Sequence, residues 1–217
     1  IFPPGYLAAT GLFGDLVTVD QAGPDYAGLQ FILDAVVPFG LSAMYDETYP
    51  INKEFVLDPL DPEFSEGWLY DRCTTFLSFY AVSGDTRFLR EAYRICAFYS
   101  ASIRLDGEQR GTFTGTTEPD DKYSHGRGVY GYYALTGDET AYEAGVAIAD
   151  YFLTDPYVSL PYQEGVTRGY DKLWTERQLG AALEAEVYGW LITGNQEYLD
   201  AATRLVVRGW LVGLEEI

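Results

Sequence analysis

Histidine and cysteine are scarce in this chain, and their scarcity narrows the chemistry that the sequence supports. His125 is the only histidine, and Cys73 and Cys96 are the only cysteines among the 217 residues. Two cysteines are too few for a zinc site of thiolates or for a fold built mainly on disulfides. No P-loop, G-x-S-x-G or H-E-x-x-H motif favours nucleotide hydrolysis or the common hydrolase triads. We therefore expect no resident metal or cofactor.

Positive charge and long apolar runs are also in short supply. The chain has 14 basic and 33 acidic residues, a formal net charge of -19, and only three of the basic residues are lysines. A field of that sign repels phosphate backbones and anionic lipids, so neither nucleic acid nor a membrane is an expected partner. No apolar run approaches the ~18 residues of a membrane-spanning helix. The acidic, lysine-poor composition predicts an extracellular or cell-surface (secreted) protein.

Hydrophobic and aromatic residues are abundant. Hydrophobic types make up 47% of the chain, enough for a sizeable core, and 19 residues are tyrosines. Tyrosines supply flat, amphipathic surface of the kind that binds sugars, and they also fill the space between packed helices. The chain begins without methionine and ends after a helical pattern, which favours an excised segment of a longer protein.

Three segments share one plan, in which a helical apolar pattern is followed by S/T-G-D/N and a second helical pattern. They cover residues 68–103, 123–153 and 174–210, and their turns fall at Gly84, Gly137 and Gly194. A glycine in the left-handed conformation ends the first helix, and the following Asp or Asn caps the second. Short connections of this kind predict antiparallel αα-hairpins, and hairpins at a regular period must stack to bury their faces.

The helix–TGD–helix segments YGYYALTGDETAYEAGVAIADYF and YGWLITGNQEYLDAATRLV resemble the six-hairpin glycosidase superfamily, the (α/α)6 toroids. That superfamily contains glycoside hydrolases, polysaccharide lyases and sugar epimerases. The resemblance covers about two-thirds of the chain and implies an all-α fold of αα-hairpin repeats that form an (α/α) toroid or part of one. Three hairpins are recognisable where a full toroid has six.

Two regions follow from this repeat. Residues 1–66 form a mixed, loop-rich N-terminal segment at the edge of the toroid, and residues 67–217 form the hairpin repeat. The loops 104–122 and 154–173 are rich in Gly, Pro, Thr and Asp, and we expect short β-hairpins in them, for example around residues 111–114. Cys73 and Cys96 fall at nearly the same height on paired helices, so a disulfide and two buried free thiols are both open.

Hairpin geometry sorts the residues into two ends. The tight turns lie at one end, whereas the starts of the first helices and the long loops lie at the other, where binding and catalysis usually concentrate. The candidate catalytic residues at this functional end are Asp121, Tyr123, His125, Arg127 and Glu176. The candidate substrate-binding residues are Trp68, Asp71, Arg72, Tyr170, Trp174 and Arg177.

The candidates suit two ways of cleaving a polysaccharide or oligosaccharide. Hydrolysis uses two carboxylates, for which Asp121 with Glu176, or Asp71 with either, are available. Elimination from a uronate uses a Tyr or His base and an arginine that neutralises the acid group, for which Tyr123, His125 and Arg127 are available. We cannot align a catalytic motif of the superfamily onto either set.

Structural roles compete with these assignments. Acidic residues at helix starts also act as caps, and Trp68 and Trp174 are equally well explained as wedges in the core. The acidic loop with Asp58, Asp61, Glu63 and Glu66 contains carboxylates that calcium prefers as ligands, but it lacks EF-hand spacing. The alternative function is a non-catalytic carbohydrate-binding or structural assembly module, and self-assembly or further domains of a longer chain stay open as partners.

Overall fold

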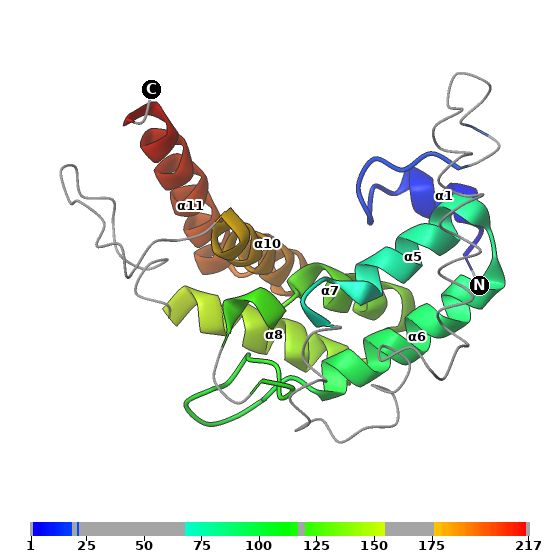
Figure 1. Cartoon of the computed structure of the whole chain (residues 1–217), viewed down its shortest axis with the longest axis horizontal. Coiled ribbons are helices and arrows are strands. Elements are labelled where there is room, and N and C mark those ends of the chain that lie inside the picture. Colours follow the sequence, from blue (N-terminus) through cyan, green and yellow to red (C-terminus); the bar gives the residue numbers. More distant parts are fainter. Residues whose placement is uncertain (1, 19–20, 22–67, 117–119, 155–175, 216–217) are drawn as a thin grey trace.

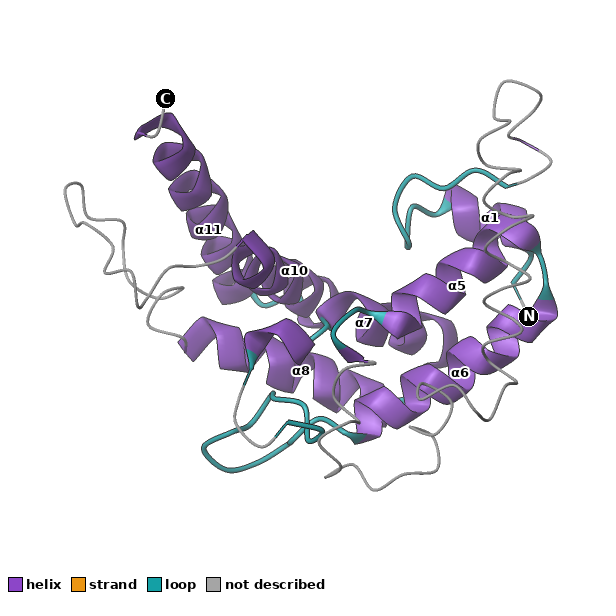
Figure 2. Ribbon diagram, in the orientation of Figure 1, coloured by secondary structure: helices purple, strands orange, loops and turns teal. Residues whose placement is uncertain are grey.

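The computed structural model describes residues 2–18, 21, 68–116, 120–154 and 176–215, and within them the chain is helical without a β-strand (Figures 1 and 2). The helices are α1 (Pro4–Ala9), α5 (Arg72–Ser83), α6 (Thr86–Ala101), α7 (Gly126–Thr136), α8 (Glu139–Thr154), α10 (Glu176–Thr193) and α11 (Gln196–Glu215). A short 3-10 helix, η3 (Asp121–Tyr123), precedes α7. The all-α prediction is confirmed for these residues.

Each of the three turns ends one helix and caps the next. Gly84, Gly137 and Gly194 have φ values of 73°, 69° and 71°, the left-handed region that glycine occupies without a Cβ clash. The Asp or Asn that follows each glycine accepts a backbone hydrogen bond from the first turn of the second helix, at 2.9, 2.9 and 3.1 Å. The hydroxyl before each glycine accepts the N–H of that Asp or Asn, which explains why the turn requires Ser or Thr.

The hairpins stand side by side in a curved row of two layers (Figure 1). The first helices of the hairpins form one layer, in which α7 contacts both α5 and α10. The second helices form the other, in which α8 contacts both α6 and α11. Helix α1 packs on α5 at the beginning of the row. Every first helix therefore lies against the first helix of the next hairpin.

The core lies between the two layers. Large apolar side chains from both layers are fully buried there: Leu77, Phe88, Ile95, Val129, Ile148, Phe152 and Leu205. Each contributes about 1.5–3 kcal/mol through removal of its apolar surface from water. The second helices carry alanines where layers approach closely, such as Ala141, Ala144 and Ala147 in α8.

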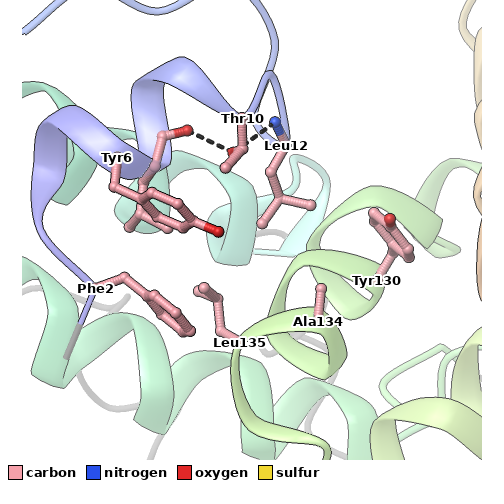
Figure 3. Close-up of a pocket in the computed structure, with 8 residues that line it drawn as sticks. Phe2, Tyr6, Thr10, Leu12, Tyr130, Ala134 and Leu135 are labelled. Atoms are coloured by element: carbon pink, nitrogen blue, oxygen red, sulfur yellow. Dashed lines mark hydrogen bonds between the residues drawn. The ribbon is translucent and has the colours of Figure 1, made fainter.

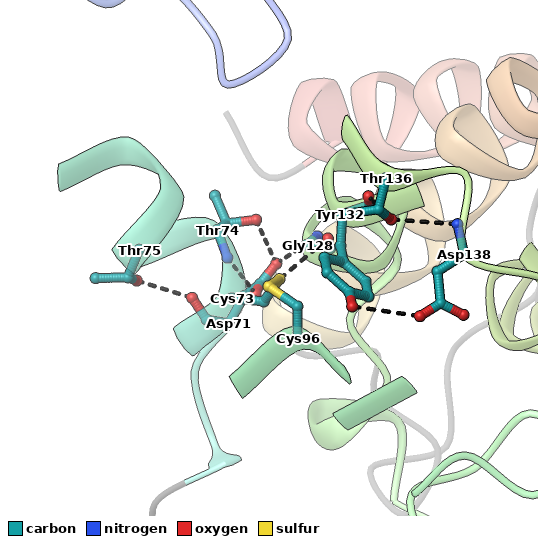
Figure 4. Close-up of a disulfide and its surroundings, with 9 residues drawn as sticks. All are labelled: Asp71, Cys73, Thr74, Thr75, Cys96, Gly128, Tyr132, Thr136 and Asp138. Atoms are coloured by element: carbon teal, nitrogen blue, oxygen red, sulfur yellow. Dashed lines mark hydrogen bonds between the residues drawn. A yellow bond between two sulfur atoms is a disulfide. The ribbon is translucent and has the colours of Figure 1, made fainter. Parts of the chain in front are cut away.

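A disulfide joins the two helices of the first hairpin. Cys73 in α5 and Cys96 in α6 are bonded, with their Cα atoms 5.0 Å apart (Figure 4). This distance agrees with the equal heights that the sequence predicts, and of the two open alternatives the structure has the bonded one. Both cysteines are buried, so the bond lies inside the first hairpin where its helices meet.

The loop after α6 folds back on itself without forming a strand. Ile103 and Phe113 make an isolated antiparallel bridge, with a hydrogen bond of 2.8 Å from Gly111 N–H to the Arg104 carbonyl. The expected short β-hairpin around residues 111–114 thus amounts to a single bridge. The loop 155–173, the acidic loop proposed for calcium and most of residues 1–66 lie outside the described residues.

Candidate functional site

The starts of α5 and α7 meet the last turn of α6 at the functional end of the hairpins, opposite the glycine turns. The Tyr99 hydroxyl on α6 donates to the Tyr123 carbonyl at 2.5 Å and accepts the His125 backbone N–H at 2.7 Å. The Nε2 atom of His125 lies 3.0 Å from the Trp68 carbonyl oxygen. Burial raises the pKa of Tyr99 well above its ordinary value, so this hydroxyl keeps its proton and both hydrogen bonds.

Helix α7 begins against two carboxylates that belong to its neighbours. Its N-cap residue is His125, whose side chain makes no capping hydrogen bond within the described structure. Instead, the Gly128 N–H donates to Asp71 Oδ2 at 2.9 Å, and the Arg127 N–H is directed to Glu184 Oε1 at 3.4 Å. Free N–H groups and the helix dipole make such a terminus attractive to anions. Asp71 from the α5 end and Glu184 from α10 occupy that position.

Asp71 serves two helices at once (Figure 4). As the N-cap of α5, it accepts the Thr74 N–H at 2.8 Å and the Thr74 hydroxyl at 2.6 Å, in addition to the Gly128 N–H. Three donors therefore converge on one carboxylate, which orients it and stabilises its negative charge. The candidate substrate-binding residue Asp71 is thus part of the link between the first and second hairpins.

Glycines allow the helices to approach this closely. A Cβ on Gly128 would lie 2.5 Å from Asp71 Oδ1, and one on Gly126 would lie 3.1 Å from the Cα atom of Ala185 in α10. The G-x-G-x-x-G spacing of residues 126–131 matches dinucleotide-binding fingerprints, but those follow a β-strand. Here η3 precedes the glycines, and the space beside them holds the Asp71 carboxylate and the α10 backbone. The spacing reflects helix packing.

Glu184 is a carboxyl of this site whose pKa is strongly raised. Burial, followed by the negative charge of Asp71, raises its pKa from 4.5 to about 7, whereas Arg127 acts in the opposite direction. A carboxyl with such a pKa exchanges its proton near neutral pH, as a general acid or base must. Burial also raises the pKa of Tyr188, which lies on the same helix with its ring 5.2 Å from that of Tyr130.

Glu184 is absent from the sequence-based candidates, although the sequence contains a signal for it. It lies ten residues before Gly194, the same register that Arg127 holds before Gly137. A second signal is that Glu184, like Glu186, is an acidic residue in a stretch of α10 that is mostly apolar. The sequence-based candidates come from the helix starts and the loops before them. Helix α10 has two more helical turns before its glycine than α7 has, so the position in α10 that corresponds to Arg127 lies inside the helix.

The remaining candidates have structural contacts. The Asp121 carboxylate accepts the Tyr151 hydroxyl at 2.6 Å, and the Tyr123 ring stacks on Phe113. The Arg127 guanidinium donates to the Phe13 carbonyl. Glu176 and Arg177 begin α10, but their side chains lie outside the described structure, as do Tyr170 and Trp174.

Trp68 lies in the core with 1% of its surface exposed. It packs against Phe98, Tyr99 and Phe113, and the Arg72 guanidinium covers it at 5.0 Å from the ring centroid. A ring enclosed in this way has no free face for a sugar. Its placement favours the core-wedge interpretation, and Arg72 is likewise buried as its companion.

A pocket of about 260 Å³ lies between α1 and α7 (Figure 3). Its aromatic lining residues are Phe2, Tyr6 and Tyr130. Phe2 and Tyr6 stack with their ring centroids 5.6 Å apart and are 44% and 57% exposed. Because Tyr130 also contacts Tyr188, the pocket adjoins the surroundings of Glu184 through one pair of rings.

Neither a metal site nor a membrane span is found in the described part of the chain. No group of three or more His, Cys, Asp or Glu residues there is placed to hold a metal ion. None of the described helices is long and apolar enough to cross a membrane.

Comparison of the chain with protein-family models, with curated proteins and with solved structures gives no match.

Proposed function

We propose that the protein is a carbohydrate-active enzyme that hydrolyses a polysaccharide with Glu184 and Asp71 as its carboxylate pair. The observation that carries the proposal is the pKa of about 7 at Glu184, which is raised in part by the neighbouring carboxylate of Asp71. Both residues lie near the start of α7, at the functional end of the hairpins that the repeat predicts. Glycoside hydrolysis needs a carboxyl that can donate a proton near neutral pH and a second carboxylate beside it, and burial gives Glu184 the first of these properties. We therefore propose Glu184 and Asp71 in place of the carboxylate pairs that include Asp121 or Glu176.

In this mechanism Glu184 donates its proton to the glycosidic oxygen as the bond to the leaving sugar breaks. Asp71, held by Thr74 and Gly128, acts on the anomeric carbon directly or through a water molecule. The positive charge of Arg127 stabilises Glu184 after it has lost its proton. If Asp71 bonds to the anomeric carbon, the proton returns when Glu184 removes one from the water that releases the product. If a water attacks instead, Asp71 takes the proton of that water and Glu184 regains its own from solvent.

Hydrolysis is better supported than elimination. The elimination scheme needs Tyr123 or His125 as a free base, but the His125 Nε2 atom already faces the Trp68 carbonyl. The chain's net charge of -19 also opposes the approach of a polyuronate. A neutral polysaccharide is therefore the substrate class that we favour.

Substrate binding and the larger architecture follow from the same proposal. The exposed aromatic rings beside the pocket, Phe2 and Tyr6, offer faces on which a sugar ring can stack. Two curved layers of hairpins are compatible with part of an (α/α) toroid, and the exposed Val206 and Val207 of α11 offer an apolar surface on which a further hairpin could pack. The Cys73–Cys96 disulfide is typical of an oxidising compartment and supports an extracellular location.

One observation favours the non-catalytic alternative. Asp71 and Glu184 both contact backbone N–H groups at the start of α7, and capping alone is a sufficient reason for two carboxylates there. On this alternative the protein binds a carbohydrate or assembles on the same helical scaffold without cleaving it.

The test is to incubate the protein with neutral and uronic polysaccharides, measuring new reducing ends for hydrolysis and ultraviolet absorbance of unsaturated uronates for elimination. Glu184→Gln and Asp71→Asn should each reduce hydrolysis by about 10²–10⁴-fold. The exposed Glu143→Gln on α8 is the matched control and should leave the rate unchanged. Activity should fall as the pH rises through 7, because Glu184 must carry a proton. Full activity in Glu184→Gln would refute the mechanism, and binding without products would favour the alternative.

A further inference from the structure

Two residues beyond Glu184, α10 carries a second acidic residue that the proposed reaction does not use. Glu186 is 0% exposed, and neither of its carboxyl oxygens has a hydrogen-bond partner within the described residues. A charge without a partner is costly to bury, so such a group normally keeps its proton. Glu186 is therefore unlike the paired acids elsewhere in the described hairpins.

Its surroundings are the junction of α8, α10 and α11. One turn further along α10 lies Gly189, where a Cβ would be 2.4 Å from the Ala149 side chain of α8 and 3.4 Å from the Tyr198 ring of α11. One turn from the enclosed Glu186, the α10 backbone is therefore in close contact with both α8 and α11.

Among the described residues, charged groups face Glu186 from α8 and α11. On α8, Asp150 contributes a negative charge and binds the Tyr198 hydroxyl of α11 at 2.5 Å, while Arg110 from the loop after α6 pairs with its other oxygen. On α11, Arg204 contributes a positive charge but makes no hydrogen bond with Glu186. Burial, more than the Asp150 charge, raises the pKa of Glu186 from 4.5 to about 8, and Arg204 lowers it.

We propose that Glu186 is a proton-dependent latch, which holds α10 against α8 and α11 while it is neutral and releases this junction when it ionises. The latch works without any assumption about catalysis. It would nevertheless reach the candidate site, because Ala185 is the α10 residue against which Gly126 packs and Glu184 precedes it. Alkaline pH would then loosen the helix that carries Glu184.

The sign of the pH dependence follows from proton binding in the two states. Between pH 4.5 and about 8 the folded protein keeps the Glu186 proton, whereas the unfolded chain releases it. The stability from this group is therefore fully present below pH 4.5 and is lost as the pH rises towards 8. The folding equilibrium constant should decrease about tenfold for each pH unit in this window.

The experiment compares urea unfolding of the wild type, Glu186→Gln and the exposed control Glu143→Gln from pH 5.5 to 7.5. Gln preserves the size of the side chain and removes only its titration. The ratio of folding constants, wild type to Glu186→Gln, should fall on the order of a hundredfold over these two pH units. The ratio of wild type to Glu143→Gln should stay constant. A constant ratio for Glu186→Gln would overturn the proposal.

Two further measurements keep the test decisive if Glu186→Gln folds poorly. NMR titration of the side-chain carboxyl carbons in the native protein should show one glutamate titrating near pH 8, whose signal is absent from Glu186→Met. Hydrogen exchange at pH 8.5 should be faster in α10 of the wild type than in α10 of Glu186→Met, whereas α5 should exchange at the same rate in both proteins. Ordinary titration of Glu186, or equal effects on α5 and α10, would contradict the latch.

Discussion

Replacing Gly128 with alanine tests whether the glycines of α7 are there for helix packing. In an exposed helix this substitution stabilises a protein by about 1 kcal/mol, because alanine has the higher helix propensity. At Gly128, however, the new Cβ would lie 2.5 Å from Asp71 Oδ1 and 2.6 Å from the Cys73 Cβ atom. Both neighbours are fixed, the first by its three hydrogen bonds and the second by its disulfide.

The magnitude follows from three contributions. Overpacking a close contact costs about 1–3 kcal/mol. Displacement of Asp71 would weaken its 2.9 Å hydrogen bond with the Gly128 N–H, and a hydrogen bond to a charged group is worth about 1.5–3 kcal/mol. The gain of about 1 kcal/mol in helix propensity offsets part of this loss. We expect Gly128→Ala to lower the free energy of unfolding by about 1.5–5 kcal/mol.

Gly180 in α10 provides the matched control. It is a helical, exposed glycine, and a Cβ added there would meet no described atom within 4 Å, so Gly180→Ala should raise the free energy of unfolding by about 1 kcal/mol. Urea unfolding followed by far-ultraviolet circular dichroism, with the disulfide kept oxidised, measures both. If the two substitutions shift stability in the same direction, the close approach of Asp71 to α7 is refuted.

Three further substitutions test other parts of the structure. Replacing Cys73 and Cys96 together by alanine should lower the free energy of unfolding by about 3.4 kcal/mol, from the loop entropy of a separation of 23 residues, and a thiol assay of the unreduced, unfolded protein should detect no free cysteine. The free energy of unfolding of the wild type should decrease relative to that of Glu184→Gln as the pH rises from 4.5 to about 7, by no more than about 1.4 kcal/mol per pH unit. Parallel plots of unfolding free energy against pH for the two proteins would contradict this. Gly111→Ala should destabilise far more than Gly107→Ala, since both have positive φ but only at Gly111 would a Cβ meet the α8 backbone, at 2.2 Å; equal melting temperatures would refute the contact.

Local sequence chemistry predicts the hairpins because everything that defines their turns lies within a few residues. The glycine, the hydroxyl before it and the Asp or Asn after it satisfy one another's backbone groups. The disulfide became a definite alternative for the same reason, since helix rise alone places Cys73 beside Cys96. All three turns have the left-handed glycine and the Asp or Asn cap that the sequence predicts.

The candidate site depends on contacts between hairpins, which spacing along the chain does not reveal. Nothing local in the sequence tells that Asp71 reaches across to Gly128, or that Glu184 faces the start of α7 while Glu186 is enclosed on another side of the same helix. Trp68 is a similar case, because its surroundings come from α6 and the loop that follows. The position of a residue relative to the glycine turns predicts whether it lies at the functional end of the hairpins, but contacts between hairpins decide which residues share a site.

The capping of α7 by its neighbours has a consequence for how the protein folds. This helix contains three glycines, and its first N–H groups face side chains from residues 71 and 184, more than fifty positions away in either direction. An isolated middle hairpin, residues 123–154, would lack both acceptors and should be unstructured in water. The units are thus unlike the interchangeable modules of an ideal repeat protein, where each unit contributes its own share of stability. The middle hairpin should form last, once both flanking hairpins are in place to receive it.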